Sequence, residues 1–189
     1  MFLVSELIAL LCVNLIFTQA LGTSTLLVAV RNKTNFVAIA VSITVFTTLG
    51  TMAAYFIDRI IPLESNYWLL ICYIAVIAFI YILSLIVLNL ISTEIFEKCK
   101  LYIHLSAFNC AVLGSVFTVH NKSLGYDDFG FGDYAFFGFQ SGIGFVLAAI
   151  IIMAAYKNLN SSKVPASFRG FPAMLVYIGI ISMAVYALK

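Results

Sequence analysis

The sequence predicts an all-α polytopic membrane protein with six transmembrane helices in two inverted three-helix repeats, the first and fourth helices being broken. Three observations lead to this prediction. The composition is too apolar for a soluble domain, and six stretches are long and apolar enough to cross a bilayer. Small and polar residues interrupt two of those stretches in the same order.

The composition points to a lipid environment. Of the 189 residues, 63% are hydrophobic and 10% are charged, and the mean hydropathy is +1.11. A typical soluble domain has roughly a quarter charged residues and a little under half apolar ones. The formal net charge of +2 is too small for a polyanion-binding surface, and the four cysteines show no Cys-x-x-Cys spacing. These properties argue against nucleic-acid binding, a cytosolic enzyme, a disordered chain and a disulfide scaffold.

Six segments are predicted to cross the membrane, because a spanning helix needs about 20 mostly apolar residues. They are Leu3–Val30, Phe36–Ile57, Trp68–Ile91, Leu101–Val119, Tyr134–Tyr156 and Gly170–Leu188. The connections between them carry nearly all the charge, and none is long enough for a separate domain. Residues 1–189 therefore form one integral membrane domain in this prediction.

The first segment shares one feature with a secretory signal, since Ala20-Leu21-Gly22 has the small-x-small pattern of a cleavage site. However, no Lys or Arg precedes it, and Glu6 stands where a signal has its positive region. The apolar run also continues to Val30. We expect this segment to stay in the membrane as the first span.

The orientation follows from the Lys and Arg residues on each side. One set of connections holds seven: Arg31, Lys33, Lys98, Lys100, Lys157, Lys163 and Arg169. The opposite side holds three: Arg59, Lys122 and Lys189. Because cytoplasmic loops are enriched in positive residues, the first set is predicted to be cytoplasmic and both termini outside.

The interruptions of the first and fourth segments resemble each other. Each has an Asn, then a Leu-Gly pair, then a small hydroxyl residue: Asn14 with Gly22 in the first and Asn109 with Gly114 in the fourth. The two Leu-Gly pairs lie 92 residues apart, close to half the chain. The pattern predicts one repeat over about 1–95 and a second over about 96–189.

Three spans in each half would invert the second repeat relative to the first. Broken helices of inverted repeats tend to meet in the membrane and to bind an ion, substrate or cofactor there. The alternative is that Gly and small polar residues merely allow close helix packing. Because polar side chains are costly in hydrocarbon, we expect Asn14, Gln19, His104 and Asn109 to face the bundle interior. His104 is either a hydrogen-bonded structural residue, a metal ligand or a proton carrier.

The stretch Asn109-Cys110-Ala-Val-Leu-Gly114 resembles the signature of a known family of membrane subunits, the Rnf-Nqr family. Its members belong to the Rnf electron-transport complex and to the sodium-pumping NADH:quinone reductase. Three further stretches are similar to family motifs in the right order: Val13-Asn14 through Leu21-Gly22, Gly138-Phe139 with Gly144-Phe145, and Val164-Pro165-Ala-Ser-Phe168-Arg169-Gly170. The resemblance therefore spans nearly the whole chain.

The resemblance implies six spans in two inverted halves, both termini outside, and a homologous six-span partner subunit of opposite orientation. It also implies a [2Fe-2S] cluster within the membrane, shared with that partner and held by two cysteines from each subunit. Cys110 matches the second family cysteine and is the expected ligand. Ser24 occupies the place of the first, so the resemblance implies a divergent member that lacks one cluster cysteine.

Serine is a poor cluster ligand because its hydroxyl must lose a proton, and iron–sulfur clusters use soft thiolates. Three interpretations remain open: a site with Ser24 as ligand or an incomplete site, a homologue that has lost the cluster, or another cofactor arrangement. Asn14, Asn109, Gly22 and Gly114 are the expected supporting residues, which would shape the segments that hold the cofactor. We further expect Cys110 and Ser24 to face each other.

The function implied by the resemblance is that of one component of an ion-translocating electron-transport complex. It would relay electrons across the bacterial cytoplasmic membrane together with flavin- and iron–sulfur-carrying subunits. The chain shows no flavin- or nucleotide-binding motif, so it is not expected to be an enzyme by itself. The alternative function is a six-span solute transporter or the substrate-binding membrane component of a vitamin uptake system. No nucleic acid is expected as a partner.

Overall fold

The computed structural model describes residues 14–30, 33–60, 66–125 and 129–187, and every regular element in these ranges is an α-helix. In chain order the helices are α2 (Leu15–Gln19), α3 (Thr23–Val30), α4 (Lys33–Ile60), α5 (Asn66–Ile91), α6 (Thr93–Ala107), α7 (Cys110–Ser123), α8 (Phe131–Leu159) and α9 (Phe171–Ala187). The predicted all-α class is confirmed for these residues.

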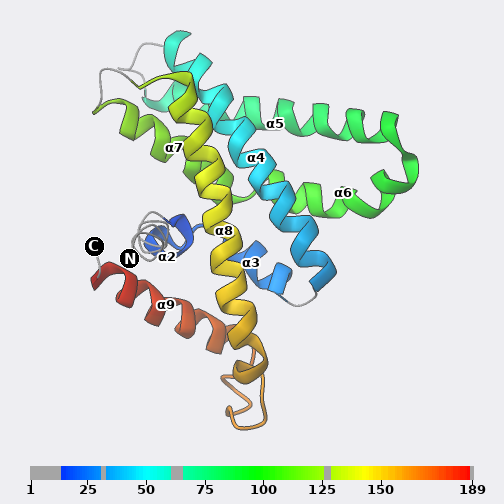
Figure 1. Ribbon diagram of the computed structural model, residues 1–189, viewed down its shortest axis with the longest axis vertical. Coiled ribbons are helices and arrows are strands. Elements are labelled where there is room, and N and C mark those ends of the chain that lie inside the picture. The colour runs from blue at the N-terminus through cyan, green and yellow to red at the C-terminus, as the bar shows by residue number, and fades with distance from the viewer. Residues whose placement is uncertain (1–13, 31–32, 61–65, 126–128, 188–189) are drawn as a thin grey trace, which may run out of the picture.

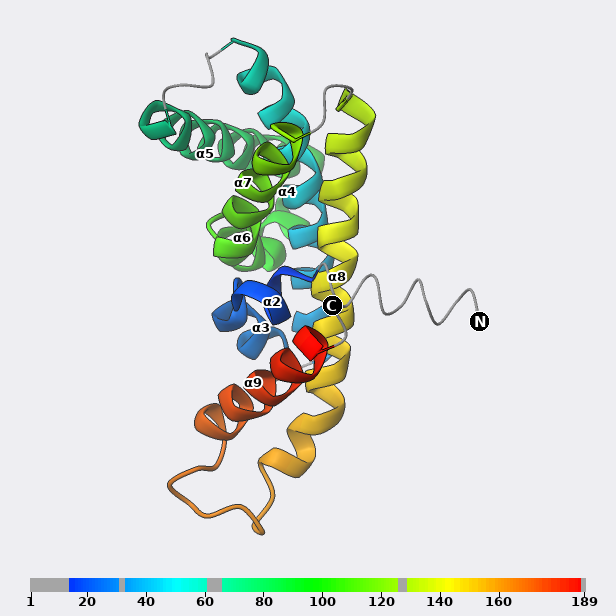
Figure 2. The same cartoon turned by 90° about the vertical axis from the view of Figure 1, so that its left-hand side faces the viewer.

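Helices α4 and α8 run side by side along the long axis of the molecule (Figure 1, Figure 2). Glycines on α8 allow the close approach: a Cβ atom added at Gly142 would lie 2.7 Å from the Cα atom of Thr44. The threonine hydroxyls of α4 are satisfied within their own helix. Thr44 donates to the Ala40 carbonyl at 2.8 Å and Thr48 to the Thr44 carbonyl at 2.7 Å. The two helices therefore meet without a buried unpaired threonine hydroxyl at these positions.

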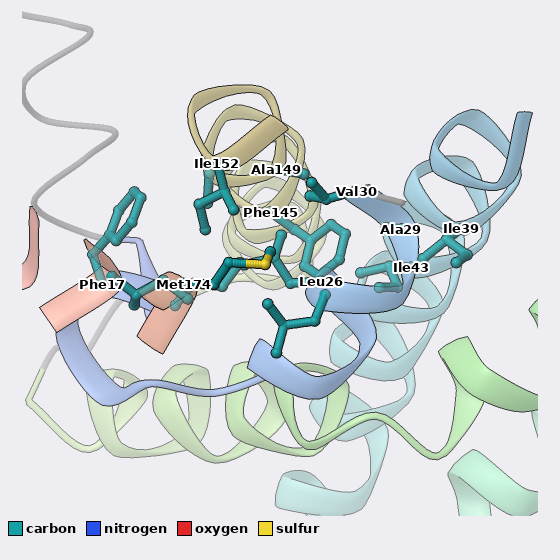
Figure 3. Packing of buried hydrophobic residues seen from close by; sticks show 14 of the residues in the cluster. Phe17, Leu26, Ala29, Val30, Ile39, Ile43, Phe145, Ala149, Ile152 and Met174 are labelled. Carbon is teal, nitrogen blue, oxygen red and sulfur yellow. The ribbon is translucent and has the colours of Figure 1, made fainter. Parts of the chain in front are cut away.

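Two hydrophobic clusters pack against this pair of helices. Toward one end, α2, α3 and α9 cover α4 and α8, with Leu26, Phe145 and Met174 among the buried side chains (Figure 3). Toward the other end, α5, α6 and α7 pack on the same two helices through residues such as Tyr73 and Val116. Since α4 and α8 contribute to both clusters, they join the two ends of the molecule.

Three helices in the described ranges are long and apolar enough to cross a membrane: Phe36–Ile60, Trp68–Ile91 and Phe131–Leu159. The pair Cys99–Ala107 and Cys110–Ser123, bent by 40° at its break, makes a fourth candidate. Helix α9 is apolar but has 17 residues. The described residues thus support three to four spans, and the six-span inverted repeat remains a prediction. The beginning of the predicted first span, with Glu6, lies outside the described residues.

Two predicted connections are in fact helical. Helix α6 begins at Thr93, directly after the extended residue Ser92, so the stretch from Glu94 to Lys100 is not a loop. Its charges suit a helix, because Glu94 lies in the first turn and Lys100 pairs with Glu97 at 2.7 Å. The predicted fourth span also continues past Val119 to the end of α7. The prediction is wrong here because charged residues that pair along a helix do not mark a loop.

Helices α5 and α6 form a hairpin that extends away from α4 and α8 (Figure 1). Most side chains of α5 are exposed or half-buried in this chain alone, including the large apolar residues Trp68, Phe79 and Leu90. A helix that is apolar on all faces is covered by lipid or by other protein. The hairpin therefore presents a broad apolar surface outside the two clusters.

Candidate functional site

The first helix break lies between α2 and α3. Asn14 begins α2: its Oδ1 accepts a hydrogen bond from the Ile16 amide at 2.9 Å, and its Nδ2 donates to the Gly144 carbonyl at 2.6 Å. The helix ends after five residues with Ala20 in the left-handed region at φ 56°. Gly22 follows at φ +81°, and α3 begins directly after it. A short capped turn thus precedes a second helix start.

The second break lies between α6 and α7. Asn109 is the N-cap of α7, and its Oδ1 accepts a hydrogen bond from the Ala111 amide at 3.0 Å. Its Nδ2 is buried and has no hydrogen-bond partner among the residues that the structure describes. The sequence pattern places equivalent breaks at the two Leu-Gly pairs. Instead, the second break comes earlier, and Gly114 lies inside α7, because the cap at Asn109 starts the helix before the glycine is reached.

The two broken segments pack directly against each other. The Gly22 amide donates a hydrogen bond to the Sγ atom of Cys110, at an N···S distance of 3.0 Å. A Cβ atom at Gly22 would lie 2.9 Å from that of Ala111 and 3.1 Å from Oδ1 of Asn109. Gly114 in turn lies against the side chain of Leu21. Each glycine therefore packs against a side chain from the motif in the other half of the chain.

Cys110 and Ser24 both lie at the surface of this chain. Cys110 is the first residue of α7 and Ser24 is in the first turn of α3, and both side chains are exposed, whereas Gly22 is buried. The sulfur of Cys110 is thus in a position that another protein chain can reach.

Comparison with known proteins then identifies the family. A family model described as "Rnf-Nqr subunit, membrane protein" matches residues 4–189. The chain belongs to this family. It is 28% identical over 178 residues to the A component of the ion-translocating oxidoreductase complex of Azotobacter vinelandii, covering 93% of this chain and 90% of that protein. It is similarly 28% identical to the same component from Pectobacterium atrosepticum, covering 93% and 89% of the two chains.

A cluster shared equally with a partner would need two cysteines from this Rnf-Nqr protein. The family positions supply one, Cys110, and Ser24 stands at the other. Among the described residues, no group of three or more His, Cys, Asp or Glu side chains could hold a metal ion. The site supplies the Cys110 thiol and, at the other helix start, the Ser24 hydroxyl. Since [2Fe-2S] clusters are bound by four thiolates, or by two with two imidazoles, the residues present do not fit a conventional cluster.

Two polar residues expected in the bundle interior are exposed. His104 lies on the open face of the α5–α6 hairpin, where its Nδ1 hydrogen-bonds to the hydroxyl of Tyr81. Gln19 lines a cavity between α2, α7 and α9. The expectation failed because no part of the chain that the structure describes covers these faces. Asn14 and Asn109, by contrast, are buried as expected, each 3% exposed.

Sequence reasoning missed one polar cluster of this Rnf-Nqr protein. The carboxylate of Asp58 accepts hydrogen bonds from the hydroxyls of Tyr73 and Tyr134, the latter at 2.6 Å. Nδ1 of His120 lies 3.1 Å from its Oδ1. The sequence pattern predicts both Asp58 and His120 in connections, yet they lie in α4 and α7. One signal in the sequence could have indicated this cluster. Asp58 and His120 each directly follow the last residue of a predicted span, and both of these span ends are predicted on the same side of the membrane.

Proposed function

We propose that this chain is a membrane component of an ion-translocating oxidoreductase complex, equivalent to the A component of its relatives. The family match covers nearly the whole chain, and the similar relatives are named as parts of such a complex. One structural observation supports a cofactor or partner site in particular. The two broken segments meet at Gly22 and Cys110, and the sulfur at this junction is exposed.

In this proposal the chain crosses the bacterial cytoplasmic membrane six times, as two inverted halves of about 1–95 and 96–189 with both termini outside. The distribution of Lys and Arg supports the orientation. Helix α9, with 17 residues, is about 25 Å long at 1.5 Å per residue, close to the length of a span. A tag placed after Lys189 should be cleaved by protease added outside spheroplasts. A tag cleaved only after the cells are opened would contradict this orientation.

The proposed partner is a homologous six-span subunit of opposite orientation that docks where Cys110 and Ser24 are exposed. Flavin- and iron–sulfur-carrying subunits would complete the complex. The exposed helix starts support this docking face, because a second chain could reach the sulfur there without moving the core. Such a component would have no activity by itself, since its role depends on cofactors that the partners carry.

The relay of electrons through this protein depends on whether the Cys110 site holds a cluster. Because Ser24 replaces one thiolate, we derive no electron-transfer step through a [2Fe-2S] group. Three arrangements remain: a cluster site with Ser24 as a ligand or an incomplete site, a homologue that has lost the cluster, or another cofactor arrangement. If a cluster is bound, Cys110 would ligate its iron, together with Ser24 in the serine-ligated arrangement.

Purification of the tagged chain with its complex tests the function. We expect it to co-purify with flavin-carrying subunits and a second six-span protein. A solute transporter, the alternative function, would instead drive substrate uptake in vesicles that contain this protein alone. The proposal would be rejected if the tagged chain purifies without those subunits and the isolated chain drives substrate uptake in vesicles.

The same preparation tests the site through its absorption and EPR spectra. If Cys110 ligates a cluster, Cys110→Ala should abolish the intramembrane iron–sulfur signal. The matched control is Cys72→Ala, which removes a half-buried free cysteine from α5 and should leave the spectrum unchanged. A normal [2Fe-2S] signal that persists in Cys110→Ala would show that this site does not hold the cluster.

A further inference from the structure

Four helices bring titratable side chains together at one end of the bundle. Asp58 comes from α4, Tyr73 from α5, His120 from α7 and Tyr134 from α8. Tyr73 and Tyr134 donate hydrogen bonds to different oxygens of the Asp58 carboxylate. The imidazole of His120 approaches Oδ1 at 3.1 Å and lies edge-on to the ring of Tyr73.

The charged members of this cluster are almost completely buried. The side chains of His120 and Asp58 are 6% and 9% exposed. Burying an unpaired carboxylate is costly, so a compensating positive charge is needed nearby. His120 can supply it, but its Nδ1 has no well-aligned hydrogen bond. Nδ1 of His120 lies 3.1 Å from Oδ1 of Asp58 and has no hydrogen bond to another group that the structure describes.

The other charged and titratable groups around the cluster have different partners. The Arg59 guanidinium lies over the ring of Tyr55 at 4.9 Å, and the Lys122 ammonium lies over the ring of Phe137 at 4.6 Å. Asp133 accepts the Gly130 amide at 2.9 Å, and Cys72 precedes Tyr73 as a half-buried thiol. The structure shows the imidazole of His120 as a basic group within ion-pair distance of Asp58.

We propose that Asp58 and His120 form a proton-binding site, in which one proton from water is held at Nδ1 of His120 against the Asp58 carboxylate. With the proton bound, the pair is neutral overall. When the proton leaves, a negative charge remains in a buried site with two tyrosine donors as its support. The change in charge within a poorly solvated site couples proton binding to the packing of all four helices.

The chemistry favours a proton over a metal cation. Both tyrosine hydroxyls donate to the carboxylate, so they present hydrogen atoms to Asp58 and two of its lone pairs are already used. A protonated imidazole repels a second cation at the remaining position. The cluster also lacks a group of three His, Cys, Asp or Glu ligands among the described residues.

The cluster lies near the ends of three helices at one end of the bundle. Asp58 lies in the last turn of α4, His120 lies in the last turn of α7, and Tyr134 lies in the first turn of α8. In the orientation proposed above, this end faces the exterior. The proton site itself depends neither on that orientation nor on a cluster at Cys110, so it goes beyond the proposed function.

The histidine content of the chain allows a direct test by NMR. The chain has two histidines, so ¹⁵N-histidine labelling of the full-length protein in detergent gives two ring systems, which His104→Gln assigns. Both proteins are measured at the same pH. We expect both ring nitrogens of His120 to carry a proton in the wild type and one of them to carry a proton in Asp58→Asn. The ring of His104, which pairs with Tyr81, is the internal control and should not change.

Two results would overturn the proposal. One is a proton occupancy of His120 that is the same in wild type and Asp58→Asn. The other is a change of the His120 ring signals when sodium replaces choline at constant pH and ionic strength, which would indicate a metal-cation site. The comparison of sodium with choline uses wild-type protein, so it tests the proposal even if Asp58→Asn does not fold. Tyr134→Phe removes one hydroxyl but keeps both charges, and should retain the doubly protonated ring.

Discussion

The Gly22 amide donates a hydrogen bond to the sulfur of Cys110 at 3.0 Å, across 88 residues of sequence. This single contact joins the break in the first half of the chain to the break in the second half. It requires Gly22 at φ +81°, a conformation that residues with a Cβ atom rarely adopt. The position of the sulfur therefore depends on the backbone of a glycine that is distant in sequence.

Gly22→Ala should destabilise the protein strongly. The left-handed conformation costs an L-residue about 1–2 kcal/mol, and the new methyl group would lie 2.9 Å from the Cβ atom of Ala111. Such overpacking typically costs about 1–3 kcal/mol more. Thermal unfolding in detergent, followed by circular dichroism, measures the loss.

Gly170→Ala is the matched control for this substitution. Gly170 has φ +86° and no atom within 4 Å of an added Cβ, so it isolates the backbone effect from the packing effect. We expect the apparent Tm to fall further in Gly22→Ala than in Gly170→Ala. Equal losses at the two positions would contradict the close packing of the two breaks.

The two capping asparagines should respond differently to serine. Both are 3% exposed, and serine is about as good an N-cap as asparagine. Asn14→Ser loses the hydrogen bond from Nδ2 to the Gly144 carbonyl at 2.6 Å. In the described part of the chain, Nδ2 of Asn109 has no hydrogen-bond partner, so Asn109→Ser loses no such bond.

We therefore expect Asn14→Ser to be less stable than Asn109→Ser by about 1 kcal/mol, the usual net contribution of one hydrogen bond. Unfolding of the two variants in the same detergent checks this difference. If Asn109→Ser proves the less stable of the two, its amide must be bound to a group that this chain alone does not supply.

Gly142→Ala should disrupt the contact between α4 and α8. The added Cβ atom would lie 2.7 Å from the Cα atom of Thr44, and backbone cannot move aside as a flexible side chain can. We expect a loss of about 1–3 kcal/mol. Gly132→Ala, in the same helix with open space around it, should not destabilise the protein. Tolerance of Ala at both positions would show that the two helices lie further apart.

Ser24→Cys should increase the iron–sulfur content of the purified complex. The substitution places a thiol in the first turn of α3, where the family pattern has its first cysteine. We expect a stronger [2Fe-2S] EPR signal per complex than in wild type. Thr23→Cys adds the same thiol one residue away and should not have this effect. If Ser24→Cys leaves the spectrum and iron content unchanged, the Cys110 site is not a cluster site.

Local sequence patterns were enough to predict much of this molecule. The long apolar runs predicted α4, α5 and α8, and the Asn and Gly interruptions predicted that two segments are broken. These features depend on neighbouring residues, since hydrophobic length and N-caps are read within a few positions of the chain. The motif around Cys110 likewise predicted the family, which the match over residues 4–189 confirmed.

Local patterns failed where burial depends on distant elements. Charged and polar residues usually end a span, and this rule wrongly places Asp58 and His120 in loops. The structure buries both, since tyrosines from α5 and α8 satisfy the carboxylate, the latter 76 residues away in sequence. His104 was expected in the bundle interior because polar side chains are costly in hydrocarbon. It is exposed because nothing in the described part of this chain covers the α5–α6 hairpin.

The sequence by itself determined the solvent of this protein, its helical class, its family and the approximate positions of its interruptions, because each follows from composition or from residues close in the chain. Only the tertiary structure decided that Gly22 holds the sulfur of Cys110, and that Asp58 meets His120. Both pairings need helices from different parts of the chain to pack in one arrangement. No local propensity encodes that arrangement, because it depends on how side chains fit together across the two hydrophobic clusters.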